Sequence, residues 1–274
     1  MNIQNSKFGA MTPRDEIKAL LHQKELFIFD LDGTLFNTLG DLAPAVNYAM
    51  TQFSLHTHSN DDVRTFIGNG SMNLIRRAVA ANFIPVVSTR DMEKVAETLT
   101  RENYSEEKIK EIHKVYSEYY WEHCTENTEP YEGVIQLVQR IADENRDGNR
   151  AVFNRDENHA GTRYAAMLTN KPIAPAQKIL KKFGLENSFA TYLCGDTTPE
   201  RKPSPAGIYE ILRQTGIAPE KAIMIGDDTP DVLAAKNAGI DCITLFEGFG
   251  KAENLLPLEP RYTAGHIRDF AEFI

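Results

Sequence analysis

The sequence has no long apolar run, and this absence limits where the protein is expected to act. No segment approaches the ~20 consecutive apolar residues that a membrane span requires, and the opening stretch has no apolar core of a signal peptide. Lysines and arginines form no block, and the formal net charge is −9. These features argue against a membrane partner and against a nucleic-acid partner. We therefore expect a cytoplasmic protein.

Cysteine is also scarce, with Cys124, Cys194 and Cys242 the only three. An odd number without metal-type spacing argues against a disulfide framework and favours a reducing compartment, so we expect these thiols to serve packing. The composition, with 42% hydrophobic and 25% charged residues, is typical of a globular protein. The length of 274 residues suits one large domain or a domain plus a smaller one.

Short apolar runs recur along the chain, and each is followed by a helical pattern. This alternation predicts an α/β protein, with a Rossmann-like parallel sheet core and helices on both faces. After the first run comes a long segment in which apolar residues recur every three or four positions, which predicts an inserted helical cap domain. The predicted domains are a discontinuous core, 1–38 and 129–274, and a cap, 39–128. The expected strands are Leu26–Asp30, Tyr164–Asn170, Phe189–Gly195, Ala222–Asp227 and Cys242–Phe246.

Polar residues follow these expected strands closely. Because the carboxyl ends of parallel strands lie at one edge of a sheet, such residues are expected to meet there and bind a ligand. Several carboxylates in one pocket repel one another, and a divalent cation such as Mg²⁺ relieves that repulsion. A lysine and a hydroxyl nearby suit phosphoryl transfer to a carboxylate nucleophile. The residues concerned are Asp30, Asp32, Thr169, Asn170, Lys202, Asp227, Asp228 and Asp231.

Four short motifs occur in order along the chain: FDLDGTLFNT, LTNK, RKPSP and IGDDTPD. They resemble the four motifs of the haloacid dehalogenase-like superfamily, from about Leu26 to about Gly250. The resemblance implies that Asp30 attacks phosphorus and forms an aspartyl-phosphate. It also implies that Asp32 protonates the leaving oxygen and later deprotonates the hydrolytic water. Gly33 would let the backbone turn tightly after these two residues.

The same resemblance implies the contacts to phosphate. Thr169 and the backbone amide of Asn170 would hold phosphate oxygens, and Lys202 would offset the charge on nucleophile and phosphate. Taken singly, Thr169 also suits a capping residue and Lys202 a solvated loop lysine. The four motifs together favour the catalytic interpretation.

The metal ligands are likewise implied by the resemblance. Asp30, the backbone carbonyl of Asp32 and Asp227 would bind Mg²⁺, with Asp231 in support. An acidic residue such as Asp231 is also favoured in the first turn of any helix, because of the helix dipole. Whether Asp228 or Asp231 contacts the metal directly is left open by the sequence.

The choice among members of the superfamily depends on which side chains are present. Asp32 argues against a dehalogenase, which has no leaving oxygen to protonate. A phosphonatase would need a lysine in the cap for a Schiff base, and no lysine occurs between Glu25 and Glu93. A non-catalytic phosphate-binding relative would be expected to lose the nucleophile or the acid, and Asp30 and Asp32 are both present.

A glycine-containing loop within the expected cap, FIGNGSMNLIRRAV, resembles loops of the phosphoglycolate phosphatases. Its backbone amides, just before a helix, suit a small carboxylate or phosphate, so Gly68, Asn69 and Gly70 are candidate substrate-binding residues. A plain turn between helices is the alternative. The sequence thus predicts a phosphatase for a small phosphorylated metabolite, foremost 2-phosphoglycolate.

Other substrates remain open at this stage. A phosphosugar mutase of the β-phosphoglucomutase type shares the core motifs and differs in using a sugar hydroxyl rather than water as acceptor. A nucleotide, pyrophosphate or sugar phosphate is a further possibility, and the sequence allows a monomer or a homodimer. Two segments lie outside the resemblance: Asn145 to Gly161, expected to be a surface loop, and PRDEIKALLHQ near the N-terminus, expected to be an amphipathic helix.

Overall fold

The computed structural model describes residues 11–144, 162–198 and 200–274. The chain divides into two compact units: unit 1, Met1–Asn37 with Pro130–Ile274, and unit 2, Thr38–Glu129. Within the described residues, no helix combines the length and the apolar character needed to cross a bilayer. The expected surface loop at 145–161 lies outside the described residues.

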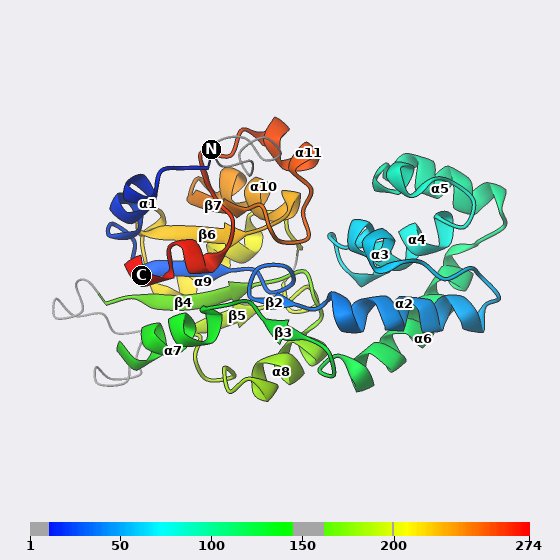
Figure 1. The fold of residues 1–274 in the computed structure, drawn as a ribbon, viewed down its shortest axis with the longest axis horizontal. Helices are drawn as coiled ribbons and strands as arrows, with labels where there is room; N and C mark the ends of the chain where they lie inside the picture. The colour runs from blue at the N-terminus through cyan, green and yellow to red at the C-terminus, as the bar shows by residue number, and fades with distance from the viewer. Residues whose placement is uncertain (1–10, 145–161, 199) are drawn as a thin grey trace, which may run out of the picture. The chain divides into compact units, whose positions relative to one another are not determined.

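Unit 1 is built on a six-stranded sheet in which every neighbouring pair of strands is parallel (Figure 1). Its order is β5-β4-β1-β6-β7-β8, which places β1 between β4 and β6. The strands are β1 (Leu26–Phe29), β4 (Tyr164–Leu168), β5 (Thr191–Leu193), β6 (Ala222–Gly226), β7 (Asp241–Leu245) and β8 (Tyr262–Ala264). The predicted Rossmann-like core is confirmed. The edge strand β8 was missed, because three residues make no recognisable apolar run.

Helices cover both faces of this sheet, which explains why every side chain of β1 is buried. Phe27 and Phe29 belong to one apolar cluster, and Leu26 and Ile28 to another. The first cluster includes α1 (Arg14–Leu21), α7 (Val134–Glu144) and α8 (Ile173–Lys182). The second includes α9 (Ala206–Thr215) and α10 (Thr229–Ala238). The N-terminal amphipathic helix expected from the sequence is α1.

Short elements complete unit 1. Single-turn segments precede β6 and follow β7 and β8. The last residues of the chain pack on the first apolar cluster through Ile267, Phe270 and Ile274. They are η4 (Pro219–Lys221), α11 (Ala252–Leu255), η5 (Leu256–Leu258), η6 (Ile267–Asp269) and η7 (Ala271–Phe273).

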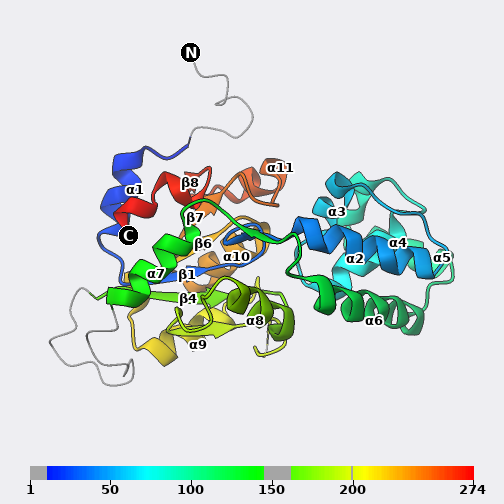
Figure 2. The ribbon, with the colours of Figure 1, turned by 60° about the horizontal axis from the view of Figure 1, so that its bottom comes forward.

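Unit 2 is helical and has an apolar core of its own. Its longest helices, α2 and α6, pack side by side (Figure 2). Its elements are α2 (Leu39–Gln52), α3 (Asn60–Phe66), α4 (Ser71–Ala80), η2 (Val86–Arg90), α5 (Met92–Arg101) and α6 (Glu106–His123). Two short strands, β2 (Phe36–Asn37) and β3 (Glu129–Pro130), stand where the chain passes from one unit to the other.

Asp41 ties together the two ends of the unit 2 segment. Its Oδ1 accepts hydrogen bonds from the backbone and side-chain nitrogens of Asn127 at 2.8 and 3.1 Å. Its Oδ2 accepts from the backbone nitrogen and the hydroxyl of Thr128, both at 2.8 Å. The approach is close enough that a Cβ at Gly40 would come within 2.9 Å of the Cβ of Asn127. A glycine is therefore needed beside the buried aspartate.

Candidate active site

Three acidic side chains meet where β1 and β6 end. Asp30 directly follows β1, and its backbone N–H donates to the carbonyl of Ile225 at 3.0 Å. Asp227 directly follows β6, and Asp231 lies in the first turn of α10. Ligand oxygens of Asp30, Asp227 and Asp231 all lie within 4.8 Å of one another. The chain adds β4 and β5 on one side of β1 and then β6, β7 and β8 on the other side, so the carboxyl ends beside β1 form the edge at which an open parallel sheet binds its ligand.

Lys202 lies among these carboxylates. Its Nζ is 2.8 Å from Asp30 Oδ1, and it donates to Asp231 Oδ1 and to the carbonyl of Leu168, both at 2.6 Å. An ammonium group has three N–H donors, so three oxygens fix its position. Burial acts to lower the pKa of Lys202, but the carboxylates of Asp231 and Asp30 outweigh it and raise that pKa above its usual value. The side chain therefore stays charged.

One ammonium group does not balance the three carboxylates. Burial raises the pKa of Asp30 to about 7 despite the attraction of Lys202, and the charge of Asp231 adds to the rise. Burial, with Asp231 and Asp30 as further causes, also raises the pKa of Asp227 well above its usual range. Asp30 Oδ1 accepts no hydrogen bond from the described residues beside its ion pair with Lys202. A buried, electron-rich cluster of carboxylate oxygens fits a hard divalent cation such as Mg²⁺.

Asp227 is held in place from two sides. Thr34 Oγ1 donates to Asp227 Oδ1 at 2.6 Å, while the backbone nitrogens of Phe249 and Gly250 donate to Oδ2 at 2.7 and 3.3 Å. A Cβ at Gly33, where φ is +85°, would come within 2.3 Å of that Oδ2. Sequence reasoning missed Thr34 and Phe249. Two sequence features could have identified them. Thr34 lies in the first motif, two positions after Asp32, and Phe249 lies between two glycines just after β7.

Asp231 supports the cluster from the start of α10. Its Oδ2 accepts hydrogen bonds from the backbone nitrogens of Asp227 and Asp228 at 3.2 and 3.0 Å, while Oδ1 pairs with Lys202. Both oxygens are thus engaged in positioning. Asp228 is the N-cap of α10, and its side chain accepts from the backbone nitrogen of Thr229 at 2.9 Å. A side-chain oxygen at this position satisfies a helix amide that has no partner within the helix.

Asp32 pairs with a lysine to which the motifs assign no role. Lys171 Nζ donates to the two carboxylate oxygens of Asp32 at 2.8 and 3.1 Å. Thr169 is buried, and its Oγ1 accepts from the backbone nitrogen of Lys171 at 3.2 Å. Asn170 Nδ2 donates to the carbonyl of Lys202 at 3.0 Å. The signal for Lys171 was its place as the last residue of LTNK, at the end of a central strand.

The glycine-containing loop lies in unit 2, between α3 and α4. Gly68, Asn69 and Gly70 have φ values of +104°, +61° and +86°, and Gly70 is the N-cap of α4. Arg77 is buried and donates from Nη1 to the three carbonyls of Phe66–Gly68 at 2.8, 3.3 and 3.2 Å. The loop is therefore an ordered turn held by an arginine that sequence reasoning also missed.

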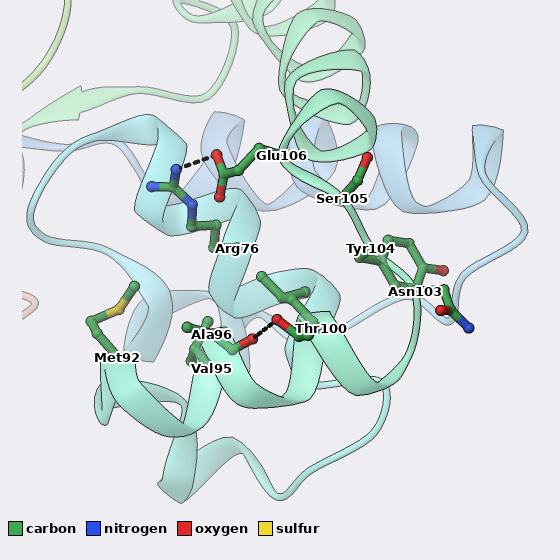
Figure 3. A pocket seen from close by; sticks show the side chains of 10 residues that line it. Arg76, Met92, Val95, Ala96, Thr100, Asn103, Tyr104, Ser105 and Glu106 are labelled. Carbon is green, nitrogen blue, oxygen red and sulfur yellow. Dashed lines mark hydrogen bonds and ion pairs between the residues drawn. The ribbon is translucent and has the colours of Figure 1, made fainter.

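A pocket of about 420 Å³ lies elsewhere in unit 2, against α4, α5 and the start of α6 (Figure 3). Its lining is largely apolar, and Arg76 pairs with Glu106 across it at 2.8 Å. None of the site residues predicted from the sequence lines this pocket. The charged cluster at the end of β1 is therefore the candidate active site.

The chain is similar to known proteins along most of its length. A family model described as haloacid dehalogenase-like hydrolase matches residues 24–239. A phosphoglycolate phosphatase from Psychrobacter arcticus is 31% identical over 86% of this chain and 90% of its own length. One from Colwellia psychrerythraea is 30% identical over 88% and 93% of the two chains. A crystal structure described as a predicted phosphoglycolate phosphatase from Haemophilus somnus is 27% identical, with a TM-score of 0.72 over 91% of this chain and 97% of that one. The chain therefore belongs to the haloacid dehalogenase-like hydrolase family.

Proposed function

We propose that the protein is a Mg²⁺-dependent phosphatase that hydrolyses 2-phosphoglycolate through an aspartyl-phosphate intermediate. The observation that carries the proposal is the placement of Asp30, at the end of the central strand, beside Lys202 and within the carboxylate cluster. Similarity to phosphoglycolate phosphatases over most of the chain supports the substrate.

In the first step an Asp30 oxygen forms a bond to phosphorus as the ester P–O bond breaks. Protonated Asp32 gives its proton to the leaving oxygen, so the alcohol departs neutral. Lys202 faces the nucleophile and stabilises the charge of the transferring phosphoryl group, and Thr169 with the amide of Asn170 holds phosphoryl oxygens.

In the second step water attacks the aspartyl-phosphate. The Asp32 carboxylate removes a proton from that water as its oxygen bonds to phosphorus and the bond to Asp30 breaks. Inorganic phosphate leaves, Asp30 is again a free carboxylate, and Asp32 is again protonated. Two aspartates thus divide nucleophilic catalysis and proton transfer between them.

The metal site would be formed by Asp30, the backbone carbonyl of Asp32 and Asp227, with Asp231 orienting Lys202 beside it. Mg²⁺ bound there would offset part of the negative charge of the phosphate and the carboxylates and so permit their close approach. Thr34 and the amides of Phe249 and Gly250 keep Asp227 pointed into the cluster.

We further propose that the helical segment 39–128 acts as a cap that selects the substrate. Gly68, Asn69 and Gly70 would bind the carboxylate of 2-phosphoglycolate through backbone amides at the start of α4. Losing a charge-assisted contact of this kind costs about 1.5–3 kcal/mol, roughly ten- to a hundredfold in kcat/KM.

A panel of phosphate esters assayed with Mg²⁺ tests the proposal. We expect the highest kcat/KM for 2-phosphoglycolate, with lower values for pyrophosphate, nucleotides and hexose phosphates. Conversion of a hexose phosphate into its isomer would instead identify a mutase, and absence of turnover with every ester would identify a non-catalytic relative.

The metal is tested separately by chelation. Activity should stop in excess chelator and return with Mg²⁺, because the carboxylate cluster otherwise repels the phosphate. Ca²⁺ should inhibit, since its larger coordination shell favours bidentate carboxylate binding and would occupy the attacking oxygen of Asp30. Full activity in excess chelator would reject the metal-dependent mechanism.

A further inference from the structure

The two aspartates of the first motif face two different buried lysines. Asp30 faces Lys202, which is also shared with Asp231. Asp32 faces Lys171, whose side chain is only 3% exposed, against 17% for Asp32. The mechanism above gives Lys202 a task and leaves Lys171 without one.

The backbone of Lys171 is held on both sides. Its N–H donates to Thr169 Oγ1 at 3.2 Å, and its carbonyl accepts from the backbone nitrogen of Gly195 at 2.9 Å. A Cβ at Gly195 would come within 2.3 Å of the carbonyl oxygen of Asn170, so the loops after β4 and β5 touch at this point. Lys171 is therefore presented from a fixed backbone.

The contact to Asp32 has two points. The Nζ lies 2.8 Å from Oδ1 and 3.1 Å from Oδ2, which fixes the carboxylate group in direction as well as in distance. Asp32 itself lies in the turn after β1, and its side chain is partly exposed to solvent. A carboxylate in that setting has several rotamers available, and an ion pair from a buried lysine selects one.

We propose that Lys171 is a positioning residue that holds the Asp32 carboxylate in the orientation from which it transfers protons. This inference rests on the proposed function, because it assigns a role relative to Asp32 as acid and base. Lys171 acts through Asp32, since its side chain is almost completely buried and its ammonium group donates to both oxygens of that carboxylate.

The test compares Lys171→Met with a matched control at the opposite end of the sheet. Lys24 is also buried and pairs with Asp241 at 2.6 Å, but it precedes β1 and lies away from the phosphoryl site. Lys24→Met therefore removes an equivalent ion pair and reports the effect of lost stability alone. Lys171→Gln and Lys171→Arg serve if the methionine variant does not fold, and thermal unfolding establishes the folded fraction of each protein.

The first readout is the dependence on the leaving group. In single turnovers, 2-phosphoglycolate must release a poor alkoxide leaving group that needs the Asp32 proton, whereas p-nitrophenyl phosphate releases a phenolate that does not. We expect Lys171→Met to slow the first step with 2-phosphoglycolate about ten- to a hundredfold, within the range of general-acid contributions. The burst of p-nitrophenolate should change less than about threefold. Lys171→Arg should recover part of the loss.

The second readout is a double-mutant cycle. If Lys171 acts through Asp32, the pair Lys171→Met and Asp32→Asn should be no slower than Asp32→Asn alone. Independent, multiplying losses would overturn the inference. So would a raised KM with unchanged kcat, which would make Lys171 a substrate ligand, or an equal kinetic loss in Lys24→Met.

These outcomes are separable from failure of the proposed function. If the wild-type protein hydrolyses no ester, or Asp30→Asn stays active, the proposed function fails whatever Lys171 does. If the wild type behaves as expected and Lys171→Met matches Lys24→Met in both readouts, only the role of Lys171 is rejected.

Discussion

Both ends of the sheet in unit 1 carry buried lysine–aspartate pairs, and the two ends differ in charge balance. At the amino end, Lys24 donates to Asp241 Oδ2 at 2.6 Å and to the carbonyl of Glu220 at 2.8 Å, so one positive charge meets one negative charge. At the carboxyl end, two lysines face four aspartates. These are Lys171 and Lys202 against Asp30, Asp32, Asp227 and Asp231.

The difference shows how one kind of contact serves two purposes. In a balanced pair, the attraction between the two charges offsets the cost of removing them from water, and the pair anchors neighbouring strands. At the carboxyl end, burial first and the neighbouring aspartates second keep the pKa values of Asp30 and Asp227 high, and such a cluster persists only because the surrounding fold holds it together. The excess negative charge is what equips the carboxyl end for a divalent cation.

The largest expected effect comes from removing the nucleophile. Asp30→Asn is nearly isosteric, so the fold should be retained while kcat falls by at least about a thousandfold. Asp241→Asn at the amino end should lower stability and leave kcat within about twofold. Steady-state kinetics and circular dichroism of both variants make the comparison. Substantial turnover by Asp30→Asn would reject the covalent mechanism.

A smaller effect is expected from the two lysines. Lys202→Met leaves Asp30 and Asp231 without their shared cation, so kcat should fall about a hundredfold or more. Lys24→Met should keep kcat. Lys202→Met breaks fully buried ion pairs and should lower the free energy of unfolding by roughly 3–5 kcal/mol, measured by urea denaturation. Lys24→Met should lower it less, because the Asp241 side chain is 29% exposed and water can solvate it. Loss of kcat in both variants alike would mean that stability, and not charge at the site, controls the rate.

Stability should also depend on pH in a way that traces to Asp30. Its pKa rises from 3.8 to about 7 on folding, so ionisation opposes folding and stability falls as the pH rises from about 4 towards 7. In chelator, Asp30→Asn should therefore be more stable than wild type at pH 8, by on the order of a few kcal/mol. The difference should disappear near pH 4. Parallel melting curves for the two proteins across this range would contradict the argument.

The smallest effect is expected in unit 2. Arg77→Gln removes the hydrogen bonds that hold the carbonyls of Phe66–Gly68, and kcat/KM for 2-phosphoglycolate should fall roughly tenfold. The rate with p-nitrophenyl phosphate should change less than about threefold. Arg76→Gln is the control, because this neighbouring arginine pairs with Glu106 and Asn73 and not with the loop. Equal losses on both esters would mean that the loop does not select the substrate.

The fold of unit 1 could be predicted because its strands are continuous apolar runs and their polar successors are conspicuous. The structure gathers Asp30, Asp227, Asp231 and Lys202, residues far apart in the chain, at one sheet edge. Parallel pairing alone requires such convergence. The edge strand β8 was not predicted because it is short and pairs with a neighbouring strand, β7, on one side only.

Residues that act on other side chains were harder to find than residues with their own chemistry. Lys171, Thr34 and Arg77 are ordinary types in ordinary positions, and their roles depend on which atom lies 2.6 to 3.3 Å away. Backbone donors such as the amide of Phe249 leave no trace in side-chain patterns at all. Only adjacent glycines, which allow close approach, hint at them.

The hydrogen bonds of Asp41 to Asn127 and Thr128 also bear on how the chain can change over time. A flexible loop of roughly ninety residues costs about 3 kcal/mol more to close than one of about four. Asp41 joins the two ends of segment 38–129 through contacts inside that segment. Folding of the segment therefore offsets much of the entropy cost of closing the loop, and formation of the sheet does not have to offset it. The segment can then diverge, lengthen or be exchanged for another while the aspartates and lysines of the sheet edge keep their places. With the proposed role of this segment as a substrate-selecting cap, substrate preference could change separately from the residues of the sheet edge.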